Sequence, residues 1–145
     1  VAPILLLFLS VSSAIQLLPI KGRLMCGNEP VFKAQIRLSN IVDRLTPKSM
    51  RSTIATAQSD SQGYFEIVGA TVREETMDPA FAIFHECNRE ILKRYGRKCD
   101  RVYWDLPDLR HINHSCNVTK WFDMGSVDLG PKRDREYLLC GLPPM

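Results

Sequence analysis

Residues 33–39 read KAQIRLS, and this stretch decides the fold. In an extended chain, Ala34, Ile36 and Leu38 point to one side, and the charged and amide side chains between them point to the other. Such alternation is typical of a strand that covers a core with one face and meets water with the other, as in antiparallel sheets. The stretch therefore predicts a half-buried antiparallel strand.

Short extended segments of this kind recur along the chain with turns between them. The residues at 27–30 and 60–63 have turn composition, and the polar segment 43–53 is predicted to be a loop. One segment differs, because NREILKRY at 88–95 has helical spacing and predicts a short helix. Further strands are predicted at 20–26, 64–68, 81–87, 100–106 and 119–129. Six or seven short strands predict an all-β antiparallel sandwich.

Length and composition are those of one globular domain. The chain has 145 residues, of which 45% are hydrophobic and 24% charged, and its net charge of +3 is too small to indicate nucleic-acid binding. Residues 1–14, VAPILLLFLSVSSA, predict a partial signal peptide without its basic n-region, cleaved near Ala14. The alternative, a membrane anchor, needs about 20 predominantly apolar residues, but serines and Gln16 interrupt this run. We expect a secreted protein whose residues 15–145 form a single domain.

Cysteines and sequons agree with secretion. In a secreted chain, five cysteines predict a disulfide framework with one thiol left over, and the CxxC pairs of a zinc site are missing. The triplets NHS at 113–115 and NVT at 117–119 are N-glycosylation sequons. They predict an exposed loop with a glycan on Asn113 or Asn117, where crowding allows only one of the two to be occupied.

Several blocks in order carry a family resemblance. They are KGRLMCG at 21–27, SDSQGYFE at 59–66, TMDP at 76–79, then Ile83, His85, Cys87 and Asn88, LPD at 106–108, FDMG at 122–125, and Cys140. The ordered set, from about Ile20 to Cys140, resembles the nematode transthyretin-like family of secreted proteins. The resemblance implies a transthyretin-like antiparallel β-sandwich of about seven or eight strands. It does not imply one activity, because a fold hosts many functions.

The spacing of the cysteines and the resemblance together predict a disulfide pairing. Cys87 and Cys99 flank a short loop, whose closure would stabilise the fold by about 3 kcal/mol, and the resemblance favours the same pair. Cys26 and Cys140 are then expected to form the second pair. Cys116 is extra to the family's four-cysteine pattern and is predicted to be unpaired. A covalent dimer through Cys116 is one hypothesis, and a free thiol is the other.

Residues for catalysis or metal binding do not form a recognisable set. The same fold hosts 5-hydroxyisourate hydrolases, whose site resembles paired histidines, an arginine and a Tyr-Arg-Gly-Ser-type tail, whereas residues 137–141 here read YLLCG. No nucleophile-elbow motif is present. His111 and His114 are interpreted as surface residues, and His85 as a residue that makes a buried hydrogen bond. We therefore expect no enzyme activity, no cofactor and no metal.

A basic segment gives the clearest functional hint. Six basic residues crowd thirteen positions: Arg89, Lys93, Arg94, Arg97, Lys98 and Arg101. In a helix, Arg89, Lys93 and Arg97 would share one face. Such a patch is suited to phosphate headgroups, sulfated glycans or an acidic protein surface. The alternative is a solvated loop of scattered charge.

The leading functional prediction is a secreted binding or adaptor protein, monomeric or dimeric, that recognises an extracellular protein, an anionic lipid or a glycan. One alternative is a carrier of a small hydrophobic ligand in the channel of a transthyretin-like oligomer. Another is a secreted structural or host-interaction protein without a dedicated small ligand. An enzyme of the hydroxyisourate hydrolase type is the least favoured, because the tail motif of that enzyme is missing.

Overall fold

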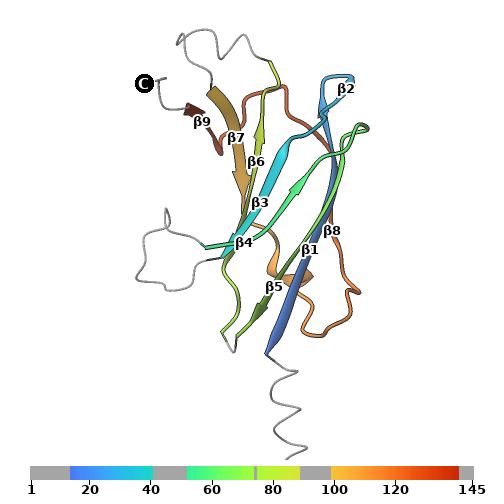
Figure 1. The fold of residues 1–145 in the computed structure, drawn as a ribbon, viewed down its shortest axis with the longest axis vertical. Coiled ribbons are helices and arrows are strands. Elements are labelled where there is room, and N and C mark those ends of the chain that lie inside the picture. The colour runs from blue at the N-terminus through green and yellow to red at the C-terminus, as the bar shows by residue number, and fades with distance from the viewer. Residues whose placement is uncertain (1–13, 41–51, 74, 89–98, 141–145) are drawn as a thin grey trace, which may run out of the picture.

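Two β-sheets packed face to face make up the protein in a computed structural model that describes residues 14–40, 52–73, 75–88 and 99–140 (Figure 1). The predicted all-β sandwich is confirmed. The helix predicted at 88–95 lies outside the described residues, apart from Asn88. Within the described ranges, the only helical element is a single 3-10 turn at Leu109–His111.

The four-stranded sheet is built around β1 (Ile15–Cys26). One edge of β1 pairs antiparallel with β5 (Tyr64–Val72) along nine residue pairs. Its other edge pairs parallel with β8 (Phe122–Asp128), and the end of β1 also pairs antiparallel with the short β2 (Glu29–Pro30). Because it has partners on both edges, β1 is the central strand of this sheet.

The five-stranded sheet is antiparallel throughout. Its strands, in spatial order, are β4 (Ser52–Gln58), β3 (Gln35–Asn40), β6 (Pro79–His85), β7 (Cys99–Asp105) and β9 (Glu136–Cys140). Its outer face is not covered by any described part of the chain.

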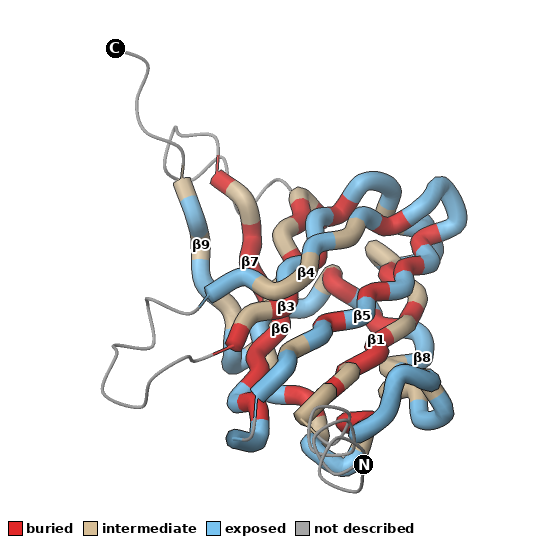
Figure 2. The backbone as a smooth tube through the Cα atoms, turned by 60° about the horizontal axis from the view of Figure 1, so that its bottom comes forward, coloured by how far each residue is buried: buried red, intermediate tan, exposed pale blue. Residues whose placement is uncertain are grey.

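The core lies between the two sheets. Buried and exposed positions alternate along β3 and β5, as Figure 2 shows. The predicted alternation at 33–39 is confirmed, because Ile36 and Leu38 are buried while Gln35 and Arg37 are exposed. Each such aliphatic side chain stabilises the fold by roughly 1.5–3 kcal/mol on burial. The remaining core residues include Leu18, Ile20, Leu24, Phe65, Ile67, Phe81 and Ile83.

Several strand boundaries differ from those predicted, and three of the differences are informative. The strand β1 begins at Ile15 rather than at residue 20. The strand β5 continues past Gly69, where a side chain would collide with Leu38 and come within 2.8 Å of Ile54. Gly69 therefore allows the two sheets to approach closely and does not end the strand. The strand predicted from residue 119 begins at Phe122.

Three strands were not predicted: β2, where residues 27–30 were expected to form a turn, and two strands of the five-stranded sheet. Residues 43–53 were expected to form a loop, but Ser52 and Thr53 belong to β4, and residues 41–51 lie outside the described ranges. The strand β9 at the end of the chain also went unrecognised. Both strands lie at the edges of the five-stranded sheet and lack a clean alternation of apolar and polar residues.

Candidate functional site

The predicted disulfide pairing is wrong, although the same four cysteines are joined. The bonds are Cys26–Cys87 and Cys99–Cys140. Cys99 and Cys140 lie directly opposite each other in the β7–β9 ladder, so Cys99 is not available to Cys87. Cys26, at the end of β1, joins Cys87 just after β6 and links the two sheets. Closure of the shorter loop is favoured by entropy, but strand register decides which sulfurs meet. Cys116 is unpaired and exposed.

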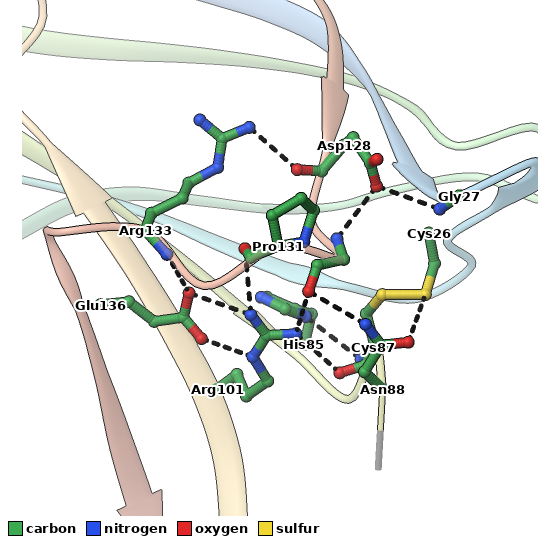
Figure 3. The surroundings of a disulfide bond; sticks show 11 residues. Cys26, Gly27, His85, Cys87, Asn88, Arg101, Asp128, Pro131, Arg133 and Glu136 are labelled. Atoms are coloured by element: carbon green, nitrogen blue, oxygen red, sulfur yellow. Dashed lines mark hydrogen bonds and ion pairs between the residues drawn. A yellow bond between two sulfur atoms is a disulfide. The ribbon is translucent and has the colours of Figure 1, made fainter. Parts of the chain in front are cut away.

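Arg101 lies beside the Cys26–Cys87 bond and is fully buried (Figure 3). Its guanidinium pairs with the carboxylate of Glu136 through Nε and, at 3.0 Å, through Nη2. Nη1 donates to the carbonyls of Cys87 (3.0 Å) and Gly130 (3.1 Å), and Nη2 donates to that of Pro131 (3.3 Å). Arg101 was predicted to belong to an exposed basic patch, and this prediction is wrong. A charge buried this deeply persists only where it is paired and fully hydrogen-bonded.

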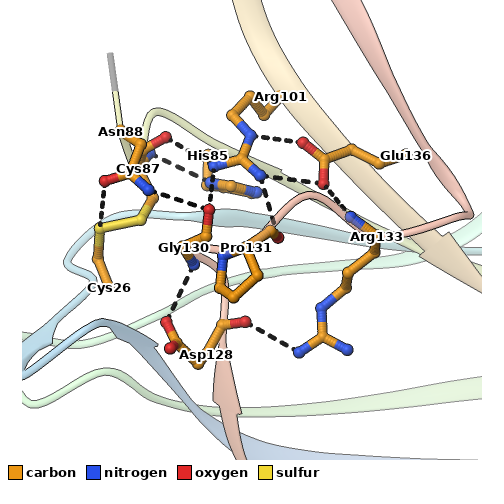
Figure 4. Close-up of polar contacts among 10 residues, drawn as sticks. All are labelled: Cys26, His85, Cys87, Asn88, Arg101, Asp128, Gly130, Pro131, Arg133 and Glu136. Atoms are coloured by element: carbon orange, nitrogen blue, oxygen red, sulfur yellow. Dashed lines mark hydrogen bonds and ion pairs between the residues drawn. A yellow bond between two sulfur atoms is a disulfide. The ribbon is translucent and has the colours of Figure 1, made fainter. Parts of the chain in front are cut away.

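Around Arg101, a polar network connects the ends of both sheets (Figure 4). The carbonyl of Gly130 accepts from Asn88 Nδ2 at 3.0 Å as well as from Arg101. Asp128 Oδ1 accepts from the backbone N–H groups of Gly27 and Gly130, both at 3.0 Å, and these hydrogen bonds lower the pKa of Asp128. Burial alone would raise the pKa of Glu136, but hydrogen bonds from Arg101 and from a backbone N–H outweigh it and lower the pKa.

His85 is buried at the edge of this network. Its Nδ1 accepts a hydrogen bond from the Cys87 N–H at 3.2 Å, as the sequence interpretation expected, and its Nε2 has no partner among the described residues. Burial and the nearby Arg101 charge lower the pKa of His85 to about 4. The imidazole is therefore neutral at neutral pH, and its lone pair is used by the backbone. These contacts give His85 and Arg101 a structural role.

The second feature is a groove of about 600 Å³ on the outer face of the five-stranded sheet. Strand register places Arg37, Ala82 and Trp104 in one row across β3, β6 and β7. The small Ala82 between two large side chains makes the hollow. The described residues that line the groove are Arg37, Ser39, Thr53, Ala80, Phe81, Ala82, Phe84, Trp104, Leu106, Arg135 and Tyr137.

The charged side chains among the described residues that line the groove are both basic, Arg37 and Arg135. The Arg37 guanidinium lies 5.1 Å from the centre of the Phe84 ring, and no carboxylate of the described residues pairs with it. Arg135 lies 5.4 Å from the Trp104 ring and forms an ion pair with Asp105 at 2.7 Å, so its charge is compensated. None of the described lining residues is acidic. Among the described residues, the groove therefore presents an apolar floor with one cation, Arg37, that no described carboxylate compensates.

The other predicted site residues have mixed outcomes. Asn113 was expected in an exposed loop but is only 3% exposed, because its side chain holds the loop together, whereas Asn117 is exposed. The remaining five residues of the basic segment lie outside the described residues: Arg89, Lys93, Arg94, Arg97 and Lys98. In the described parts of the chain, no helix is long and apolar enough to cross a membrane. The same parts contain no group of three or more His, Cys, Asp or Glu side chains placed to hold a metal ion.

The groove was missed because its residues come from five separate segments. One sequence feature does indicate the groove: in FAIFHEC at 81–87, the outward positions include Ala82 and Phe84. A strand whose outer face meets only water would be expected to carry polar residues there. Apolar residues on both faces of this strand are the signal that sequence analysis overlooked.

Comparison with known proteins gives consistent matches. A family model described as TTR-52, transthyretin-like family, matches residues 21–107. Transthyretin-like protein 46 of Caenorhabditis elegans is 30% identical over 139 residues, which cover 94% of this chain and 74% of that protein. Transthyretin-like protein 2 of the same organism is 27% identical over 123 residues, with 83% of this chain and 80% of that protein covered.

Proposed function

The chain belongs to the transthyretin-like family, and we propose that it is an extracellular binding protein whose groove takes a small anionic amphiphile. The two disulfides fit an oxidising, extracytoplasmic environment. The observation that carries the proposal is the uncompensated charge of Arg37 beside an apolar hollow. The proposed activity is binding, without a covalent step.

Arg37 is suited to hold the anionic head of such a ligand. Its guanidinium carbon lies 5.1 Å from the centre of the Phe84 ring, and its N–H groups make no hydrogen bond to a described residue. A guanidinium edge matches the geometry of a carboxylate, and a charge-assisted hydrogen bond is about twice as strong as a neutral one. Since no described lining residue is acidic, an anion meets no like charge in the groove.

The apolar floor is suited to the body of the ligand. Ala80 and Ala82 form its base, and Trp104 and Leu106 are partly exposed at its side. A volume of about 600 Å³ lies within the range of roughly 300–1,000 Å³ that is typical of small-molecule sites. Each methylene group that leaves water contributes about 0.8 kcal/mol, so alkyl chain length is expected to set affinity until the groove is full.

The groove lies within one chain, which separates this proposal from the carrier alternative. A carrier that uses a channel between subunits needs an oligomer, whereas the described groove residues come from the five-stranded sheet and from positions directly next to its strands. Size-exclusion chromatography with bound ligand distinguishes the two. A monomer that binds one ligand per chain supports the groove, and binding only in an oligomer supports the channel.

Trp104 provides a direct assay. The chain has two tryptophans, and Trp121→Phe leaves Trp104, in the groove, as the single reporter. Titration with laurate is expected to change the Trp104 emission and to saturate at one ligand per chain. Replacing laurate by decanoate removes two methylene groups and is expected to weaken binding about fifteenfold, on roughly 0.8 kcal/mol each.

Arg37→Met in the same background tests the anionic head. It is expected to weaken laurate binding about tenfold or more, and to leave the binding of neutral dodecanol unchanged. The matched control is Arg23→Met, because Arg23 also stacks on a ring, that of Tyr64 at 4.9 Å, but lies on the other sheet. Equal laurate affinity of the Arg37→Met variant and its parent, or no laurate binding at all, would refute the proposal.

A further inference from the structure

We propose that in the native protein Asn117 carries an N-linked glycan and Asn113, in the other sequon of the same loop, is unmodified, because a chain with a sugar on Asn113 could not close the loop that its side chain organises. In the transfer step, Nδ2 of Asn117 forms a bond to the anomeric carbon of an oligosaccharide. The bond from that carbon to the phosphate of a lipid-linked diphosphate donor breaks, and the amide loses one proton. The lipid diphosphate is the leaving group.

The hydrogen-bonding positions of the Asn113 side-chain amide are all occupied. Its Nδ2 donates to the carbonyls of His111 at 3.0 Å and Lys120 at 2.9 Å. Its Oδ1 accepts from the Thr119 N–H, the Thr119 hydroxyl and the Lys120 N–H, at 2.9, 3.0 and 3.0 Å. A sugar on Nδ2 would replace one of the two donated hydrogen bonds and would need space at a position that is 3% exposed.

The backbone of Asn113 is also fixed. Its N–H donates to the Leu17 carbonyl at 2.7 Å, and its carbonyl accepts from the Leu17 N–H at 2.8 Å. This bridge places the residue against the start of β1. A bulky group on Asn113 would therefore have to displace either the loop or the edge of the four-stranded sheet. A chain glycosylated at Asn113 is not expected to reach the native fold.

Asn117 lies in the opposite situation. It is exposed, as are Ser115 and Cys116 before it and Thr119 two residues after it. In the described structure, its side-chain amide makes no hydrogen bond, and only its backbone contacts Ser115 Oγ. A glycan on this amide would extend into solvent without breaking a contact.

The Thr119 hydroxyl determines when the transfer takes place. This hydroxyl completes the sequon of Asn117, yet in the folded loop it donates to Asn113 Oδ1. The glycosylating enzyme can therefore use this hydroxyl only before the loop closes. Glycan addition is expected during chain entry into the secretory pathway, and the native protein is expected to be a poor acceptor.

The position of the loop is compatible with the proposed binding groove. The loop between β7 and β8 lies beside the beginning of β1, on the far side of the molecule from β9 (Figure 1). A glycan there would cover one end of the four-stranded sheet. The groove on the five-stranded sheet would stay open.

Two point variants separate the sequons, in the full chain secreted from a eukaryotic cell line behind a standard leader. Asn117→Gln is expected to remove the glycan-dependent gel shift and to leave secretion intact, because residue 117 is exposed. Ser115→Ala destroys only the first sequon and keeps Asn113, so the shift is expected to be unchanged. Loss of the shift in Ser115→Ala, its persistence in Asn117→Gln, or two glycans on the wild type would overturn the proposal.

Peptide mapping of the wild type decides the question even if a variant fails to fold. Enzymatic removal of the glycan converts the modified asparagine to aspartate. The resulting mass change is expected at residue 117 and not at residue 113. Unmodified asparagine at both positions in the secreted protein would refute the assignment.

Discussion

Replacing Glu136 by glutamine is the sharpest test of the buried network, because it removes one charge and almost no volume. Arg101 is completely buried and the side chain of Glu136 is only 5% exposed. Glu136→Gln leaves the guanidinium with the three carbonyls of Cys87, Gly130 and Pro131 but without a counter-charge. Breaking a buried pair from one side costs about 3–5 kcal/mol, and this is the expected loss in free energy of unfolding.

Urea denaturation with the disulfides intact measures this loss, and the fluorescence of the two tryptophans reports unfolding. The double variant Arg101→Met, Glu136→Leu removes both charges, and it is expected to be more stable than Glu136→Gln, because no lone charge remains buried. The control is Arg110→Met, which removes an exposed ion pair with Asp108 and is expected to leave stability unchanged. A loss below about 1 kcal/mol for Glu136→Gln would mean that the pair is solvated like a surface pair, and our account of the network would be wrong.

Three further predictions concern other residues. Because the pKa of His85 is lowered to about 4 from 6.5, the unfolded chain binds a proton in this window and the folded protein does not, so stability is expected to fall as pH drops from about 6.5 to about 4. In His85→Leu, urea midpoints measured across this window should fall less steeply than in the wild type, and an unchanged slope would rule out His85 as its source. Cys116 is expected to react with iodoacetamide in the native protein, and alkylation of none or of several cysteines would contradict the observed pairing. Reversing the charge of the basic segment with the substitutions Lys93→Glu, Arg94→Glu and Arg97→Glu is expected to abolish binding to anionic vesicles and heparin. A wild-type protein that binds neither would disprove the patch hypothesis.

Sequence reasoning succeeded where one strand face is buried and the other is wet. At 33–39 the alternation fixes both the strand and its inward face, because a shift by one residue would bury Arg37. It failed at β4, STIATAQ, where four of the seven positions are exposed and the other three only partly buried, so that no periodic contrast is present. The strand β9 is short and has half-exposed Tyr137 and Leu139 facing outward, which hides its pattern.

Site prediction failed for a different reason. Disulfide partners and groove residues are set by which strands become neighbours, and this is a property of topology rather than of local spacing. Arg101 appeared in a run of basic residues, yet its position in β7 turns it inward toward Glu136, which is 35 positions away. Asn113 and Asn117 have the same sequon chemistry, but only the folded loop reveals that one of them is buried.

Both disulfides lie at the same end of the sandwich, where β1, β6 and β9 finish and β7 begins. The chain between Cys87 and Cys99 is therefore held at each end by a covalent bond to a different partner strand. Lengthening such a tethered segment costs little, because the entropy of loop closure grows only with the logarithm of its length. Insertions and substitutions at 89–98 should be tolerated without loss of the fold, so that relatives with this framework can vary their surface chemistry there while the two sheets stay fixed.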